Sequence, residues 1–284
     1  MIKFYEVASV EESKLRDLAN QYSVHEIALE DCLHRDQRPK LDDFENHKFL
    51  VWFCYFQDRI YEIQFIIFND TLILVPHEKS PIGNTWSEFL NFNSNSNSNL
   101  DVWHATYYLL DKLTDITWTE LRQLYHYVDD FELNIFKKEV KPLELIKIKR
   151  KLNNIELSIG HLSSVAIQLQ NLNLNSHDLN WKLRDLHDHC ERINRSLAMY
   201  RGQTTSTIDL YWGLQANKTN YQIKKLTLIA SIGLPLSFWS SFWGMNFEII
   251  PFKTAELFFA AIAIMCISVG LTIYFLVKKG IWQD

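Results

Sequence analysis

The pattern of hydrophobic and polar positions changes along this 284-residue chain, and its first part is typical of a sheet. Short segments rich in aromatic and β-branched residues predict strands at residues 2–7, 49–56, 60–68 and 71–75. Asp58 and the pair Asn69-Asp70 lie where tight turns would join the last three. Helices are predicted at 11–22 and 24–33, the second with Ser23 as its N-cap and Glu26 completing a capping box. Residues 1–100 are therefore predicted to form an α/β domain with a mixed sheet.

Helical patterns dominate after residue 100. Residues 91–99 are mostly asparagine and serine, and we expect a mobile loop there because such a stretch buries no apolar surface. Residues 101–138 keep an apolar face, and Lys141-Pro142 ends that helix and starts another. The face comprises Tyr108, Leu109, Leu113, Ile116, Leu121 and Leu124. We assign residues 101–176 to helices of the same soluble body.

Two series of apolar residues at alternating spacings of three and four predict helices that pack as in coiled coils. The first comprises Leu152, Ile155, Ile159, Leu162, Ala166 and Leu169; the second comprises Leu179, Leu183, Leu186, Cys190, Ile193, Leu197 and Tyr200. No proline lies between His177 and Leu234. One stalk helix is therefore predicted over residues 177–243, with a length of about 100 Å.

Two apolar segments near the C-terminus are long enough to cross a bilayer. Residues 226–243 carry no charge, and residues 255–277 carry only Glu256. At about 1.5 Å per residue, each can span a hydrocarbon core about 30 Å thick. The linker at residues 244–254 is too short to form a domain. The two segments therefore predict a transmembrane hairpin with both ends on one side.

Basic residues indicate which side that is. Lys224 and Lys225 precede the first span, Lys278 and Lys279 follow the second, and the linker contains only Lys253. The positive-inside rule predicts cytoplasmic termini, an external loop at 244–254 and a basic cytoplasmic tail at 278–284. The chain starts without the apolar region of a signal peptide. We expect a multi-pass protein of the cell (inner) membrane.

Composition excludes several classes of function. A net charge of −5 disfavours nucleic acid as a partner, and the sequence has neither a G-x-G-x-x-G nor a P-loop motif for nucleotide phosphates. His187, His189 and Cys190 could suggest a transition-metal site with Asp185, but Cys190 falls on the apolar stripe and the others on its flanks. No catalytic constellation emerges, so we expect neither an enzyme nor an organic cofactor.

The first span carries small and polar residues on one face. Two series at heptad spacing lie side by side there: Asn220, Thr227, Leu234 and Ser241, and Ile223, Ala230, Ser237 and Gly244. Bulky residues such as Trp239 and Phe242 occupy the opposite face. Such a stripe either lets helices pack closely or lines a wet path, and the stripe alone does not choose between these.

Several motifs together carry a resemblance to the CorA family of magnesium transporters. Gly244-Met245-Asn246 ends the first of two C-terminal spans, and a basic tail runs from Lys278 to Trp282. The stalk segments 184–189 and 217–220 are similar to family segments in the same register. The segments 28–32 and 38–40 near the N-terminus also fit. The resemblance covers most of the chain.

That resemblance implies a homopentameric funnel that moves Mg²⁺, or the related Co²⁺ or Ni²⁺, across the bilayer. The implied selectivity entrance is Gly244, Met245 and Asn246, with Glu248 in the adjoining loop. The implied pore lining is Asn220, Ile223, Leu226, Thr227, Leu234, Ser237 and Ser241. Mg²⁺ is also implied as a regulatory ion, bound in the cytosol by Asp185 with Asp188.

One departure leaves the transported ion open. Family members usually continue with Pro-Glu after the motif, whereas here Pro251 precedes Phe252 and Lys253. The loop has lost a carboxylate and gained a cation, which predicts weaker attraction of divalent ions. A ZntB-like zinc transporter is the alternative, although that branch commonly has Gly-Ile-Asn. From another class, a membrane-anchored oligomeric scaffold or sensor without transport also fits an apolar hairpin.

Overall fold

The computed structural model describes residues 3–9, 11–34, 37–76, 81–95, 101–135, 142–172, 174, 176–245 and 255–278. The chain divides into two compact units, Met1–Ile208 and Asp209–Asp284. The first unit holds the sheet and most helices, and the second holds two long apolar helices.

A five-stranded mixed sheet forms the centre of the first unit, as the sequence predicts. Its strands are β1 (Lys3–Glu6), β2 (Lys40–Asp43), β3 (Lys48–Phe56), β4 (Arg59–Ile67) and β5 (Thr71–Pro76), in the order β1-β5-β4-β3-β2. Among the strands that the structure describes, only β1 and β5 pair in parallel. Gln57 and Asp58 have φ angles of 46° and 66°, which matches a tight hairpin between β3 and β4. The short edge strand β2 was not predicted.

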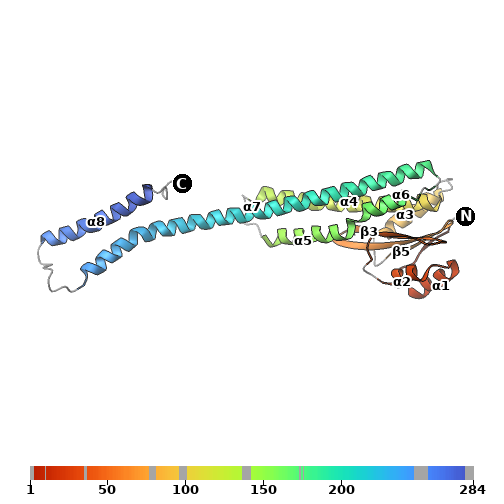
Figure 1. Ribbon diagram of the computed structural model, residues 1–284, viewed down its shortest axis with the longest axis horizontal. Coiled ribbons are helices and arrows are strands. Elements are labelled where there is room, and N and C mark those ends of the chain that lie inside the picture. The colour runs from red at the N-terminus through yellow and green to blue at the C-terminus, as the bar shows by residue number, and fades with distance from the viewer. Residues whose placement is uncertain are drawn as a thin grey trace. The chain divides into compact units, whose positions relative to one another are not determined.

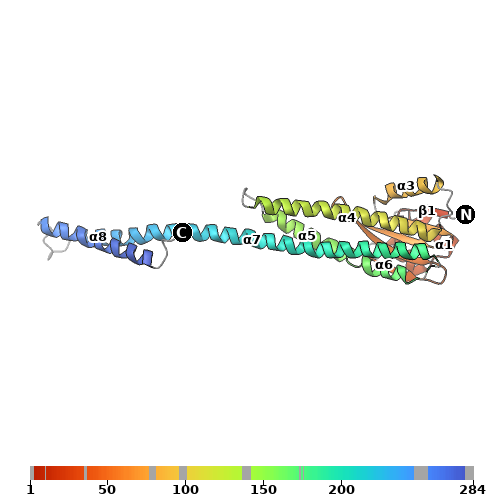
Figure 2. The same ribbon diagram turned by 90° about the horizontal axis from the view of Figure 1, so that it is seen from above.

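Helices lie on both faces of this sheet (Figure 1). On one side are α1 (Glu12–Tyr22) and α2 (Glu26–Leu33). On the other are α4 (Val102–Asn134), α5 (Pro142–Ile159), α6 (Leu162–Gln170) and the first part of α7 (His177–Trp243), and Figure 2 shows α4 beside α7. All thirteen residues of the two predicted apolar series are buried, from Leu152 to Tyr200. Packing between these helices and the sheet forms one continuous core.

The prediction that Ser23 caps α2 is wrong. Ser23 has a left-handed backbone with φ of 53°, and its N–H donates to carbonyls at the end of α1, so it closes that helix. An N-cap requires an extended backbone, which His25 supplies. The His25 Nδ1 accepts from the Ile27 N–H at 3.2 Å.

The loop predicted at 91–99 is also partly wrong, because α3 (Ile82–Asn95) continues through residues 91–95. Trp86 and Phe89 in this helix are buried, and both rings pack edge-on against Phe4 of β1. Aromatic packing of the first turns supports a helix that composition alone disfavours. Residues 96–99 lie outside the described part of the chain.

The second unit contains the end of α7 and helix α8 (Ala255–Lys278). Both helices are long and apolar enough to cross a membrane. None of the residues of α8 is buried, and large apolar side chains along both helices are exposed in the single chain. These faces require lipid or further protein to cover them.

Candidate ion-binding and permeation sites

An acidic cluster forms where α4 lies beside α7 in the first unit. Asp111 and Asp115 are one turn apart on α4, and Asp185 and His189 are one turn apart on α7. Ligand atoms of Asp111, Asp115 and His189 lie within 4.8 Å of one another. His189 Nδ1 is 3.5 Å from Asp111 Oδ1, and its Nε2 is 3.7 Å from Asp185 Oδ2. The imidazole therefore stands between carboxylates of two helices.

Burial and neighbouring carboxylates make the cluster unfavourable for a negative charge. Burial raises the pKa of Asp111, and the Asp115 and Asp185 carboxylates raise it further, while His189 and Lys112 oppose them. Burial and the same carboxylates, Asp111 foremost, raise the pKa of the neighbouring Tyr107 to about 12. Asp111 Oδ1 and His189 Nδ1 are buried and face each other at 3.5 Å, and neither makes a hydrogen bond within the described chain. A buried carboxylate oxygen without a hydrogen bond, close to two further carboxylates, fits a bound cation.

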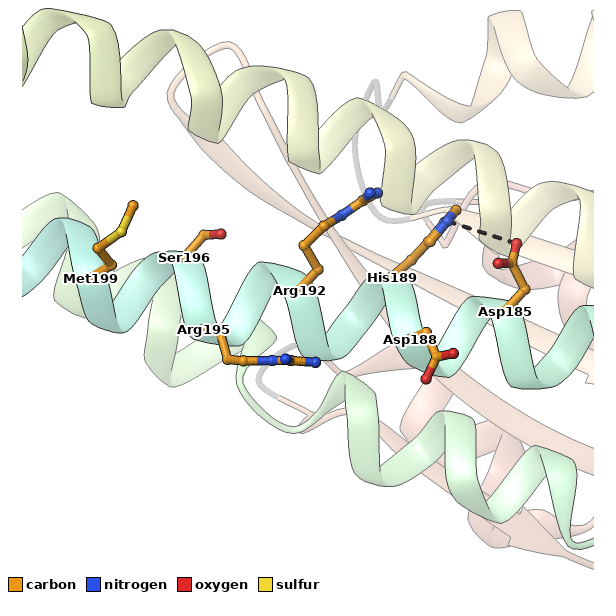
Figure 3. Close-up of a pocket in the computed structure, with 7 residues that line it drawn as sticks. All are labelled: Asp185, Asp188, His189, Arg192, Arg195, Ser196 and Met199. Atoms are coloured by element: carbon orange, nitrogen blue, oxygen red, sulfur yellow. Dashed lines mark ion pairs between the residues drawn. The ribbon is translucent and has the colours of Figure 1, made fainter.

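Asp185 and Asp188 turn to different sides of α7 (Figure 3). Asp185, His189 and Arg192 point toward α4, and the Arg192 guanidinium lies 4.8 Å from the ring centre of Trp118 on that helix. Asp188 points the other way, and its Oδ1 is 3.5 Å from His187 Nδ1. Both carboxylates still line one open hollow of about 690 Å³ on the surface of α7.

Asp111 and Asp115 were not predicted from the sequence to belong to an ion site. Their spacing of four beside the apolar face of the predicted helix was a usable signal, because it places two carboxylates on one flank. The sequence does not show which face of α4 packs against α7. The structure brings Asp111, Asp115, Asp185 and His189 together and leaves Asp188 beside His187.

In the second unit, all seven residues implied to line a pore have exposed side chains: Asn220, Ile223, Leu226, Thr227, Leu234, Ser237 and Ser241. Gly244 and Met245 are exposed too, and they finish the last turn of α7. The Gly244 N–H donates to Ser240 O at 3.0 Å and the Met245 N–H to Phe242 O at 3.3 Å. Asn246, Glu248 and Lys253 lie outside the described residues.

The family model described as CorA-like Mg²⁺ transporter protein matches residues 1–279. The chain belongs to this family. The cobalt/magnesium transport protein CorA of Thermotoga maritima is 28% identical in an alignment 272 residues long, which covers 91% of this chain and 77% of that protein. The putative metal ion transporter YfjQ of Bacillus subtilis is 24% identical in an alignment 288 residues long, gaps included, which covers 98% of this chain and 88% of that protein.

Solved structures share the fold. The CorA magnesium transporter from Methanocaldococcus jannaschii matches with a TM-score of 0.83 and 17% identity, over 98% of this chain and 90% of that one. The ZntB cytoplasmic domain from Vibrio parahaemolyticus matches with a TM-score of 0.66 and 14% identity, over 76% and 89%. At these identities the likeness concerns the fold alone, so it does not choose between the two branches.

Membership in the CorA-like family confirms the broad predictions. The protein is a membrane-bound divalent metal transporter and not an enzyme. Its two candidate spans lie at the C-terminal end, where the hairpin was predicted.

Proposed function

We propose that this CorA-like protein conducts Mg²⁺ through a homopentameric pore lined by the second half of α7. The observation that carries the proposal is the stripe of small and polar residues on α7, which leads to Gly244-Met245 in a chain that belongs to the CorA-like family. Polar side chains within the span, such as Thr227 and Ser237, are less favourable against lipid than apolar ones. A ring of copies that encloses the stripe removes this cost and creates a wet path.

Residues Gly244, Met245 and Asn246 form the entrance in this proposal. Mg²⁺ loses its water reluctantly, so it is best recognised through its hydration shell. A ring of neutral Asn246 amides and backbone carbonyls holds the hydrated ion without trapping it. Further along the pore from this entrance, the polar side chains that line it are Asn220, Thr227, Ser237 and Ser241. Ile223, Leu226 and Leu234 form apolar constrictions that close the path by excluding water.

Regulation is assigned to the cytosolic acidic residues. The ligand pair expected from the sequence, Asp185 with Asp188, is extended by the α4 carboxylates Asp111 and Asp115 and by His189. A divalent cation bound there relieves the repulsion that raises the pKa of Asp111. Because α7 includes both Asp185 and the proposed pore lining, cation binding can change the position of the lining.

Mg²⁺ is proposed over Zn²⁺ because the entrance sequence reads Gly-Met-Asn and because most site groups carry hard oxygen ligands. Co²⁺ and Ni²⁺, which also form hydrated octahedral ions, are secondary substrates. We place both termini in the cytoplasm, because the lysines that flank the two spans then obey the positive-inside rule. Glu248 remains in the loop as a carboxylate that attracts cations.

Ion uptake into liposomes tests the proposal. Purified full-length protein and Asn246→Ala are compared with a fluorescent Mg²⁺ reporter, and with Zn²⁺, Co²⁺ and Ni²⁺ in parallel. We expect Mg²⁺ flux that is lost in Asn246→Ala, because the amide ring that holds the hydrated ion is removed. Zinc flux without magnesium flux would move the protein to the ZntB-like alternative. If none of the four ions is transported, the result would favour a membrane-anchored scaffold or sensor.

A further inference from the structure

Both apolar helices carry the same pair of residues where the apolar segment ends on the side away from the hairpin loop. On α7, Tyr221 is followed four residues later by Lys225, and on α8, Tyr274 is followed by Lys278. The Lys225 Nζ lies 4.5 Å from the centre of the Tyr221 ring, and the Lys278 Nζ lies 6.0 Å from that of Tyr274. The i,i+4 spacing thus gives each helix one tyrosine–lysine pair on its surface.

Each pair lies about one hydrocarbon thickness along its helix from the hairpin loop. Lys225 precedes Trp243, the end of α7, by about 27 Å of helix, and Lys278 follows Ala255, the start of α8, by about 35 Å. These lengths bracket the hydrocarbon thickness of about 30 Å. The tyrosine rings are 52% and 58% exposed, so neither is covered by the rest of the chain. Both lysines therefore reach the headgroup layer of one leaflet.

The surrounding sequence is cationic. Lys218 and Lys224 lie on the same part of α7, and residues 210–245 contain no aspartate or glutamate. Each aromatic ring restricts the long lysine side chain while its ammonium group stays exposed. Ammonium groups held at headgroup depth match the phosphate of an anionic lipid, each contributing a substantial attraction near the surface.

We propose that the Tyr221–Lys225 and Tyr274–Lys278 pairs bind the headgroup phosphates of anionic phospholipids. Together they form a cationic collar that fixes the depth of both spans in the leaflet. The inference uses the proposed function only to name that leaflet as cytoplasmic. Lipid binding itself does not depend on which ion the protein carries.

Spin-labelled lipids provide the test. Full-length protein is reconstituted in phosphatidylcholine bilayers, and electron paramagnetic resonance compares its association with labelled phosphatidylglycerol and labelled phosphatidylcholine. We expect the wild type to prefer phosphatidylglycerol. The preference should fall by up to about fivefold for each lysine in Lys225→Gln and Lys278→Gln, and approach one in the double variant. A wild type that binds both lipids equally overturns the proposal.

Matched variants test whether the preference for phosphatidylglycerol comes from the two tyrosine–lysine pairs or from positive charge anywhere on the protein. Tyr221→Phe keeps the aromatic face and should keep the preference, whereas Tyr221→Leu should weaken it. Lys147→Gln removes an exposed lysine of α5 and should change nothing. A preference that falls equally in Lys147→Gln, or that millimolar inorganic phosphate abolishes, contradicts a headgroup site. Ion flux is measured separately, so an inactive protein that still selects phosphatidylglycerol overturns only the proposed function.

Discussion

At the scale of single residues, Asp111 has the least favourable environment in the acidic cluster. One carboxylate oxygen is buried without a hydrogen bond, and burial together with Asp115 raises its pKa. A group whose pKa is higher in the folded state binds protons more tightly there. Its ionisation therefore lowers the free energy of unfolding as pH rises through that pKa. At neutral pH and without a divalent cation, the Asp111 charge destabilises the fold.

Asp111→Asn is expected to raise the melting temperature of the metal-free full-length protein at pH 7 and to reduce the further rise that Mg²⁺ produces. Removal of the charge from this partly buried carboxylate is worth about 1 kcal/mol, which corresponds to roughly 2–4 °C in a protein of this size. Thermal unfolding in detergent, with and without Mg²⁺, measures both effects. The gain should disappear at acid pH, where Asp111 is protonated in the wild type.

Asp178→Asn is the matched control on α7. Lys182 holds the pKa of Asp178 below its usual value, so the charged form is favoured in the folded state. Its replacement should not raise the melting temperature. If both variants raise it equally, a general reduction of negative charge explains the result, and Asp111 has no special place in a cation site.

At the scale of elements, Gly160 lies at the break between α5 and α6, inside the first of the two apolar series. A β-carbon at Gly160 would lie 2.5 Å from the Glu156 carbonyl oxygen. The Asn194 side chain of α7 donates to Gly160 O at 3.2 Å and to Ser163 Oγ at 3.1 Å. The break between α5 and α6 is therefore held by a polar contact from the long helix.

Gly160→Ala is expected to destabilise the protein by about 1–3 kcal/mol, because the backbone must move to admit the methyl group. Gly202→Ala is the control, since a β-carbon at this exposed position of α7 meets nothing within 4 Å. It should stabilise by about 0.5–1 kcal/mol through helix propensity. Melting temperatures recorded at one scan rate compare the two. Equal effects of the same sign would contradict this account of the break.

Periodicity predicted most elements because burial imposes it. The stripe from Leu179 to Tyr200 and the strands β3 to β5 are apolar where they pack, so the sequence shows them directly. The features it missed depend on tertiary contacts. Trp86 and Phe89 hold α3 in place through Phe4, and Asn194 meets Gly160 across two helices. Asp111 and Asp185 both contact His189 because α4 packs beside α7.

At the scale of the whole molecule, charge near the entrance decides how well dilute divalent ions are collected. The segment after Gly244-Met245-Asn246 contains Glu248 but also Lys253. In the proposed homopentamer each loop charge occurs five times, so one substitution changes the potential at the mouth strongly. Rings of carboxylates raise the local cation concentration, and rings of lysine lower it.

Lys253→Glu is therefore expected to increase Mg²⁺ uptake severalfold at low Mg²⁺ and low ionic strength, with little change at saturating Mg²⁺. The gain should shrink in about 1 M salt, where screening acts within about 3 Å. Uptake into liposomes across a series of Mg²⁺ concentrations measures the apparent affinity and the maximal rate separately. An unchanged affinity at low salt would show that Lys253 does not act on the ions that enter. A gain that persists in high salt would point to altered loop structure, because a purely electrostatic effect of five charges cannot escape screening.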